Sequence, residues 1–421
     1  MTDLSINTSS SSIKHGARNL AMTSLGHFVN DGTVFFFPLL VDILVKVNSL
    51  SPLFVTFLLG IFYTAASLFS IMVGRISELW DRKGLLIGMG LSLMAIGVLG
   101  FYEVITGSLG AALPYIAGLS ALSAGVGSSF YHPLGGAILQ STFTPRSRGK
   151  ALGVNGSMGS VGRAIYPSLL YGFAALLTLD FSFVVFAIIA VISAVFIAFF
   201  LRDVRSRPKP ANEIPEQGKK AKGNRGILTY SIIMLSVVTF IRSTASQGIS
   251  SWIPSYLSNV KDLGISSLLG YSITLMFIAA IVGQPIFGYF ADRMDKRVLL
   301  SISSFGTAAS TLAYINSSGL ESLVFLVIFG FFTFSGFPLL FSLISEYVPR
   351  GDSSMANSVV WGLGNQGGMA LGPILVGLII VDNYSRLPFT FTIMVAVTVV
   401  SGILVFALPR PAGKAKMSLF G

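Results

Sequence analysis

Long apolar stretches recur along the chain, and short polar segments separate them. A helix needs about 20 mostly apolar residues to cross a hydrocarbon core of about 30 Å, and each stretch supplies that length. The predicted spans begin near Asn19, Leu53, Leu85, Ala112, Gly149, Phe181, Ile227, Ser266, Val298, Leu323, Met355 and Leu387. The pattern therefore predicts an all-α polytopic membrane protein with twelve transmembrane helices.

The longest polar segment, 202–226, divides the predicted spans into six and six. It is charged and rich in Pro and Gly, which is typical of a flexible linker. Residues 1–18 are polar and Ser-rich and contain no apolar signal-peptide core, so we expect a disordered cytoplasmic tail. The predicted organisation is an N-terminal bundle at 19–201, the linker at 202–226, a C-terminal bundle at 227–408 and a second tail at 409–421.

Composition and charge agree with this organisation. Only 11% of the residues are charged and the mean hydropathy is +0.78, whereas soluble domains are about one quarter charged. The net charge of +11 would suit a nucleic-acid partner, but 23 of the 28 Lys and Arg residues fall on one side of the predicted spans. The positive-inside rule makes that side cytoplasmic, together with both termini and the linker. Topology thus explains the charge, and we expect no nucleic-acid partner.

The two halves of the chain repeat each other. The stretch "GRISELWDRKGLL" from Gly74 aligns with "GYFADRMDKRVLL" from Gly288 at an offset of 214. Offsets between 205 and 216 relate further pairs, namely Gly32 and Gly248, Pro38 and Pro254, Pro133 and Pro338, and Pro167 and Pro373. A duplication of six spans keeps the sidedness of the chain, so the repeats should be parallel and related by an axis along the membrane normal.

These features resemble the major facilitator superfamily over nearly the whole chain. The repeated loop pattern Gly-x-x-x-acid-x-x-x-basic-basic implies a cytoplasmic latch in which Glu78 and Asp292 hold the halves together. A carboxylate near a helix N-terminus gains about 0.3–1 kcal/mol. The first latch should be weaker, because Leu79 stands where a basic residue is usual. The predicted gate comprises Gly74, Glu78, Asp81, Arg82, Gly288, Asp292, Arg293, Asp295 and Lys296. The alternative is that these charges only set topology.

A few ionisable residues fall inside the predicted spans. A charge at the bilayer centre costs from about 2.5 to more than 10 kcal/mol, so such residues usually face a cavity or a partner. Asp31, Arg163 and Arg242 fall near mid-membrane in the first, fifth and seventh spans, and His132 lies in the fourth. His27 and Asp31 are four residues apart, so they share a helix face and can pair.

This arrangement predicts a proton site and an anion site. In a cavity, Asp31 can load and release a proton, and His27 can relay it or tune it. Two arginines against one carboxylate favour an anionic or zwitterionic substrate, because the guanidinium fork suits carboxylate or phosphate. The predicted substrate-binding residues are Arg242, His132, Arg163, Asn30, Gln247, Asn365 and Gln366. Structural roles are the alternative: Asp31 as a bridge to His27 or Arg242, Arg163 bound to backbone carbonyls or to Asp31, and His132 bound to a carbonyl freed by Pro133.

A narrower resemblance appears in "HFVNDGTVFFFPLL", "GSSFYHPLGGA" and "IRSTASQGISSWIPSYL". These stretches resemble the fosmidomycin-resistance branch, whose members are similar to drug and anion exporters driven by proton antiport. That branch often has an acidic residue after His-Pro, whereas this chain has Leu134. The glycine runs "GVNGSMGSVG" and "GLGNQGGMALG" resemble those of nitrate carriers, but we expect them to serve close helix packing.

The sequence thus predicts a secondary active transporter that works by alternating access. Its expected activity is proton-coupled export of a small anionic or amphiphilic compound, such as a drug or phosphonate, with no cofactor and no metal. Uptake of a small organic or inorganic anion is the alternative. An intramembrane enzyme is disfavoured, because no metal-type carboxylate cluster or Ser/His/Asp set is apparent. A non-transporting receptor derived from the same fold stays as a further alternative. We expect a monomer embedded in the lipid bilayer of the inner or plasma membrane.

Overall fold

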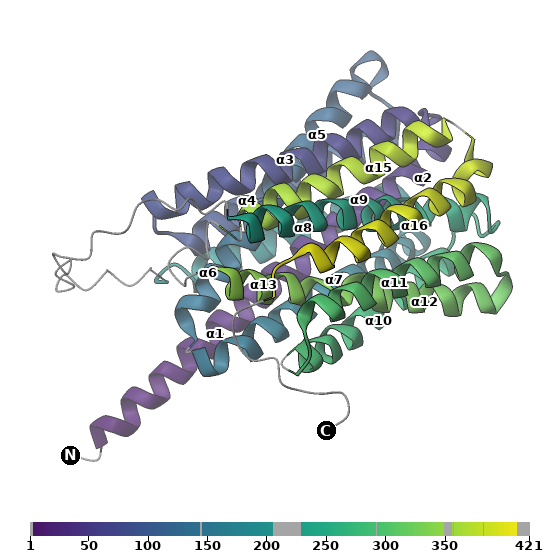
Figure 1. Ribbon diagram of the computed structural model, residues 1–421. Coiled ribbons are helices and arrows are strands. Elements are labelled where there is room, and N and C mark those ends of the chain that lie inside the picture. Colours follow the sequence, from purple (N-terminus) through teal and green to yellow (C-terminus); the bar gives the residue numbers. More distant parts are fainter. Residues whose placement is uncertain are drawn as a thin grey trace.

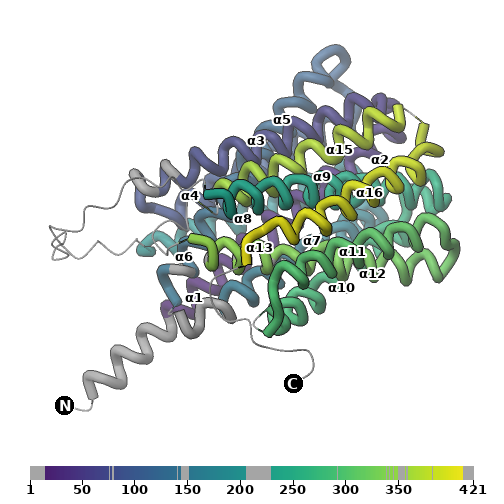
Figure 2. Tube along the Cα trace, viewed as in Figure 1, coloured from purple at the N-terminus to yellow at the C-terminus, as the bar shows by residue number. Residues whose placement is uncertain are grey.

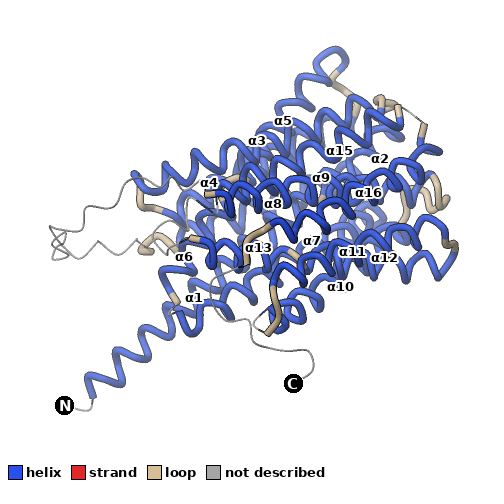
Figure 3. Tube along the Cα trace, viewed as in Figure 1, coloured by secondary structure: helices blue, strands red, loops and turns tan. Residues whose placement is uncertain are grey.

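The computed structural model describes residues 3–143, 145–204, 229–291, 293–348, 356, 358–381 and 383–410. Helices form all the regular structure in these ranges (Figure 3). Most of the predicted linker and of the C-terminal tail lies outside the described residues.

The first half contains α1 (Asp3–Val34), α2 (Phe36–Asn48), α3 (Pro52–Leu79), α4 (Lys83–Thr106), η1 (Gly110–Ala112), α5 (Leu113–Ser128), α6 (Tyr131–Thr142), α7 (Pro145–Leu176) and α8 (Leu179–Phe200). The second half contains α9 (Tyr230–Asn259), α10 (Ser267–Ala291), α11 (Lys296–Asn316), α12 (Gly319–Ser335), α13 (Phe337–Tyr347), η2 (Ser358–Gln366), α15 (Gly367–Ile380), η3 (Tyr384–Arg386), α16 (Leu387–Leu404) and η4 (Val405–Ala407).

Every predicted span corresponds to helix. Ten stretches in the described part are long and apolar enough to cross a membrane, the first being His15–Asn48, which joins α1 and α2. The predicted fifth span is α7, which has 32 residues. The predicted tenth span is the apolar helix α12, which has 17 residues and is continued by α13.

Local sequence sets where the helices begin. Ser51 accepts a hydrogen bond from the Phe54 N–H at 3.2 Å, and Pro52 at the first helical position has no N–H to leave unpaired. Thr178 caps α8 in the same way through the Phe181 N–H at 3.3 Å.

Three spans are broken just ahead of a proline. The breaks between α1 and α2, between α5 and α6, and between α12 and α13 precede Pro38, Pro133 and Pro338. A proline lacks the N–H and clashes with the carbonyl four residues earlier, so the helix before it ends. The breaks of the fourth and tenth spans lie at equivalent positions of the repeat, and the first of them positions His132 in the first turn of α6.

The two halves pack along several pairs of helices. Within the first half α1 packs on α7 and α4 on α5 and α8, and within the second half α9 packs on α15 and α16 (Figures 1 and 2). Between the halves, α3 packs on α15, α7 on α10 and α2 on α9. Hydrogen bonds cross this interface from Ser67 to the Gly362 carbonyl at 2.9 Å and between Ser168 and Thr274 at 2.6 Å.

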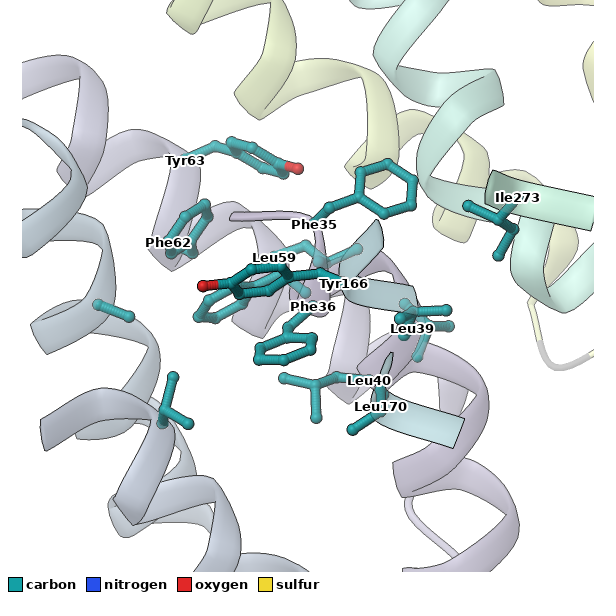
Figure 4. Packing of buried hydrophobic residues seen from close by; sticks show 14 of the residues in the cluster. Phe35, Phe36, Leu39, Leu40, Leu59, Phe62, Tyr63, Tyr166, Leu170 and Ile273 are labelled. Atoms are coloured by element: carbon teal, nitrogen blue, oxygen red, sulfur yellow. The ribbon is translucent and has the colours of Figure 1, made fainter. Parts of the chain in front are cut away.

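Buried aromatic side chains fill the space around the start of α2. Phe36 lies among Leu59, Phe62 and Tyr166, while Phe35 points toward the second half (Figure 4). The Phe37 and Phe62 rings stack at 3.8 Å, and Phe35 meets Phe277 of α10 edge-to-face at 4.5 Å. Such pairs add about 0.5–1.5 kcal/mol to the burial of their area.

The start of α1 differs from the prediction. The helix begins at Asp3 and so covers most of the segment expected to be a disordered tail. Once the apolar span has formed a helix, each added residue gains one backbone hydrogen bond without a new nucleation cost, and polar side chains do not prevent this. Arg18 in this helix forms an ion pair of 3.0 Å with Asp203, just after α8.

Candidate functional site

A cluster of ionisable side chains surrounds Asp31 of α1. The Asp31 carboxylate has one oxygen 3.3 Å from Nε2 of His27 and the other 3.3 Å from Nε2 of His132. Arg163 Nε lies 3.8 Å from the oxygen that faces His27, and Asn30 donates to the other oxygen at 3.0 Å. We call His27, Asn30, Asp31, His132 and Arg163 the Asp31 cluster.

Three helices build the Asp31 cluster. α1 supplies His27 and Asp31 one turn apart, and the break before α6 brings His132 against them. Gly159 of α7 permits the close approach, since a Cβ there would lie 2.4 Å from Nε2 of His27 and 2.9 Å from Asp31 Oδ2. This glycine run therefore serves the site as well as helix packing.

The cluster lies against the second half of the chain. Arg163 packs over the rings of Phe277 and Phe334 at 5.7 and 5.3 Å, and it donates to Ser160 at 3.0 Å. Gln284 of α10 donates to the same Ser160 hydroxyl at 2.9 Å. Movement between the halves would therefore act directly on Arg163.

Burial makes the charges of the cluster mutually dependent. The Asp31 side chain is 7% exposed and that of Arg163 18%. A buried carboxylate is costly unless it is paired and hydrogen-bonded, and here one arginine and two histidines compete for it. The Asp31 carboxylate can therefore be neutralised either by a proton or by the Arg163 guanidinium, and one can replace the other.

The same atoms have a spacing that suits a metal ion. The ligand atoms of His27, Asp31 and His132 lie within 4.8 Å of one another. However, Arg163 places a fixed positive charge beside the shared carboxylate, and this opposes a second cation there. Arg163 therefore disfavours a metal ion at these atoms.

Arg242 lies apart from the Asp31 cluster. It is 2% exposed, and its Nη2 donates to the Ser303 hydroxyl and to the Thr333 carbonyl, both at 2.8 Å. Its guanidinium therefore lies at the break between α12 and α13, next to Gly336. Within the described residues no carboxylate forms an ion pair with it, so the structure does not bring Arg242 to Asp31.

The remaining predicted binding residues form a second, neutral group. Gln247 donates to the Tyr63 hydroxyl at 2.8 Å across the halves, and Asn365 accepts from Ser243 at 2.6 Å. Gln366 is buried, and its Oε1 atom has no hydrogen-bond partner among the described residues.

The repeat relates this neutral group to the Asp31 cluster. An offset of 216 aligns His27 with Ser243 and Asp31 with Gln247, whereas 206 aligns Gly159 with Asn365. Gly159 faces His27 in the first half, and Asn365 contacts Ser243 in the second. The same helix positions therefore carry ionisable groups in the first half and neutral ones in the second.

The predicted gate residues make local contacts where the structure describes them. Asp81 pairs with Lys83 at 2.5 Å, and Lys296 pairs with Glu346 of α13. Asp295 caps α11 by accepting from the Arg297 N–H at 2.9 Å. Arg293 stacks on Tyr289 at 3.5 Å. The Arg82 N–H donates to the Trp80 carbonyl at 2.7 Å, and a Cβ at Gly74 or Gly288 would meet nothing within 4 Å. Asp292 and the side chain of Glu78 lie outside the described residues, so the latch stays a prediction.

The hydrogen bonds of Asp295 also affect its protonation. Arg297 Nη2 donates to Asp295 Oδ2 at 2.6 Å. These side-chain hydrogen bonds hold the pKa of Asp295 below its ordinary value, although partial burial acts in the opposite direction.

Sequence reasoning missed one buried acid. Asp42 in α2 is fully buried; its Oδ1 accepts from Asn259 of α9 at 2.9 Å, and its Oδ2 lies 3.4 Å from Lys46. Lys46 also bonds Ser258 of α9. The signal in the sequence was the spacing of four between Asp42 and Lys46 at the end of the first span.

Known proteins give an independent view of the chain. The family model of the Major Facilitator Superfamily matches residues 23–276 and 259–419. Among curated proteins, the cis,cis-muconate transport protein of Acinetobacter baylyi is 24% identical over 231 residues, which cover 52% of this chain and 54% of that protein. The multidrug resistance protein MdtG of Salmonella arizonae is 29% identical over 189 residues, covering 42% of this chain and 45% of that protein. The chain thus matches about half the length of these relatives.

Solved structures agree on the fold. A D-xylose–proton symporter superposes with a TM-score of 0.72 at 16% identity, covering 94% of this chain and 99% of that chain. The human organic anion transporter MFSD10 (TETRAN) superposes with a TM-score of 0.67 at 18% identity, covering 93% and 99%. At such identities the likeness concerns the fold alone. The chain is an integral multi-pass membrane protein, and it belongs to the Major Facilitator Superfamily.

Proposed function

We propose that this protein is a proton-coupled secondary transporter that exports a small anionic or amphiphilic compound by alternating access. The observation that carries the proposal is the contact of one buried carboxylate, Asp31, with His27, His132 and Arg163 where the two halves meet. A lone structural ion pair needs only one partner, whereas Arg163 and two histidines that compete for it allow the carboxylate to change partners.

The coupling follows from the shared oxygen of Asp31. His27 and Arg163 both approach Oδ2, at 3.3 and 3.8 Å. When a proton lies between His27 and Asp31, the carboxylate needs Arg163 less, and the guanidinium is available to an anionic substrate. When the proton leaves, Arg163 returns to Asp31 and the substrate is released. Proton and substrate are then held together, which by itself gives symport; antiport requires in addition that a donor or cationic group of the substrate replaces the proton at Asp31.

The surroundings support an anionic or amphiphilic substrate. Arg163 offers the bidentate donor geometry that carboxylates and phosphates accept. The rings of Phe277 and Phe334 flank it, and Trp361 lies 5.8 Å from His132, so an apolar body attached to the anionic group would find aromatic contacts. The resemblance to the fosmidomycin-resistance branch points in the same direction.

Uptake of a small organic anion is the second candidate. It is favoured by the names of two relatives, the muconate transport protein and a putative tartrate transporter of Agrobacterium vitis, which is 24% identical over 260 residues that cover 58% of this chain and 59% of that protein. In uptake the same exchange on Asp31 would run as symport, with the proton and the substrate entering together.

The test is proton flux in liposomes that contain the purified protein and a pH dye. Phosphonates, dicarboxylic acids and lipophilic drugs are added under an imposed proton gradient. We expect one class to trigger flux that Asp31→Asn abolishes and that the exposed control Asp262→Asn keeps. The sign of the flux separates export from uptake. Full gradient-driven transport by Asp31→Asn would overturn the coupling role.

A further inference from the structure

Asn155 of α7 contacts His27 on the side away from Asp31. His27 Nδ1 lies 2.8 Å from the backbone oxygen of Asn155 and 3.1 Å from its side-chain Oδ1. Asn155 is 6% exposed, and its Nδ2 donates to the Tyr131 hydroxyl at 2.9 Å.

Both Asn155 oxygens are acceptors, so Nδ1 of His27 carries a proton. Nε2 then faces Asp31 Oδ2 at 3.3 Å. If His27 were neutral and Asp31 ionised, two acceptors would face each other across this distance. One proton on the line between Nε2 and Oδ2 removes that conflict, whichever of the two atoms holds it.

The orientation of the Asn155 amide is itself determined. The Tyr131 hydroxyl donates its one proton to the Thr23 carbonyl of α1 at 2.8 Å. The hydroxyl, which lies 2.9 Å from Nδ2 and 3.1 Å from Oδ1 of Asn155, therefore accepts from Nδ2. This leaves Oδ1 as an acceptor for His27 and links α1, α6 and α7 in one closed chain of hydrogen bonds.

We propose that Asn155 is a positioning residue that holds Nδ1 of His27, so that Nε2 and Asp31 share a single exchangeable proton. The titratable and charged groups that face His27 are Asp31 from α1 together with Tyr131 and His132 from α6, while Arg163 from α7 faces Asp31. The inference deepens the proposed function and rests on it for its role in transport. The hydrogen-bond geometry of His27 stands without it.

Nitrogen NMR of protein labelled with ¹⁵N-histidine tests this directly, because the chain has only 3 histidines. The signals are assigned with His15→Gln, His27→Gln and His132→Gln, and pH titrations are recorded in lipid. In the unaltered protein we expect His27 to keep its proton on Nδ1 at every pH where the ring is neutral. A neutral His27 with its proton on Nε2 would contradict the inference.

Two substitutions should act in opposite directions. Asn155→Leu keeps the backbone acceptor but removes Oδ1, so His27 should take up its second proton at a pH about one unit lower. Asn155→Asp supplies a charged acceptor, so uptake should move to higher pH. Asn316→Leu, at an exposed position of α11, is the control and should change nothing. Equal titrations in the Leu and Asp variants, with the signal of His132 intact, would overturn the proposal.

The outcomes separate the inference from the proposed function. Opposite shifts without any substrate-driven proton flux would keep the positioning role of Asn155 and remove the transport coupling. Flux that depends on Asp31, with His27 titrating alike in all variants, would keep the coupling and remove the role of Asn155.

Discussion

Arg163 and Asp31 meet across α7 and α1, with Arg163 Nε 3.8 Å from the carboxylate oxygen that also faces His27. This is longer than a good charge-assisted hydrogen bond, which measures about 2.7–2.9 Å. The guanidinium is therefore close enough to stabilise the ionised carboxylate and loose enough to leave it.

Arg163→Gln should uncouple transport from the proton gradient. The glutamine can still bond Ser160 but cannot neutralise Asp31, so the proton should stay on the carboxylate and substrate-driven flux should fall at least about tenfold, which corresponds to about 1.4 kcal/mol. Arg163→Lys keeps the positive charge but lacks the planar, bidentate guanidinium group, so it should retain part of the flux. The measurement is the liposome pH assay. Undiminished proton-driven flux in Arg163→Gln would contradict the exchange of partners on Asp31.

Gly159→Ala should damage the site by crowding alone. A Cβ at this position would meet the His27 ring and the Asp31 carboxylate, and overpacking typically costs about 1–3 kcal/mol. We expect both a lower melting temperature in detergent and a loss of transport. Gly153→Ala is the matched control from the same helix, because its Cβ would meet nothing within 4 Å. Similar behaviour of the two variants would show that the close approach is unimportant.

The cap of α11 should add a pH-dependent part to the stability. The pKa of Asp295 is lower in the folded protein than its ordinary value of 3.8, so its stabilisation is complete above that value and is lost as the pH falls through the lower folded pKa. As the pH falls below about 4, the melting temperature should therefore decrease less in Asp295→Asn than in the unaltered protein, because the asparagine still caps the helix but does not titrate. Thermal unfolding at a series of pH values measures this, and parallel curves for the two proteins would refute it.

Periodicity and charge predicted most of the fold but only part of the site. The length of apolar stretches depends on the thickness of the bilayer, so the spans could be read directly, and the repeat identified the two halves. The contact of His27 with Asp31 also followed from spacing, because both lie on one helix. The positions of His132, Arg163 and Arg242 depended on how separate helices rotate and pack, which no spacing records. Arg242 lies in the middle part of α9, yet its helix turns it toward Thr333 rather than toward Asp31. Asn155 was hidden within a glycine run whose packing role was evident.

Asp42 should help to close the end of the molecule that we predict to be non-cytoplasmic. It joins α2 to Asn259 of α9, and Asp42→Ala would remove this link and the ion-pair partner of Lys46, although the Asn259 amide would keep its hydrogen bond to the Ser255 carbonyl. Opening of this end should then become easier by about 1–3 kcal/mol.

Because the chain has no cysteine, a single one at Ser255, which is fully buried on α9, can report opening through its reaction with a membrane-impermeant maleimide. We expect slow labelling in the Ser255→Cys protein and at least about fivefold faster labelling when Asp42→Ala is added. Glu103→Ala, at an exposed position in α4, is the control and should leave the rate unchanged. Equal labelling rates with and without Asp42 would mean that the contact with Asn259 does not hold this end closed.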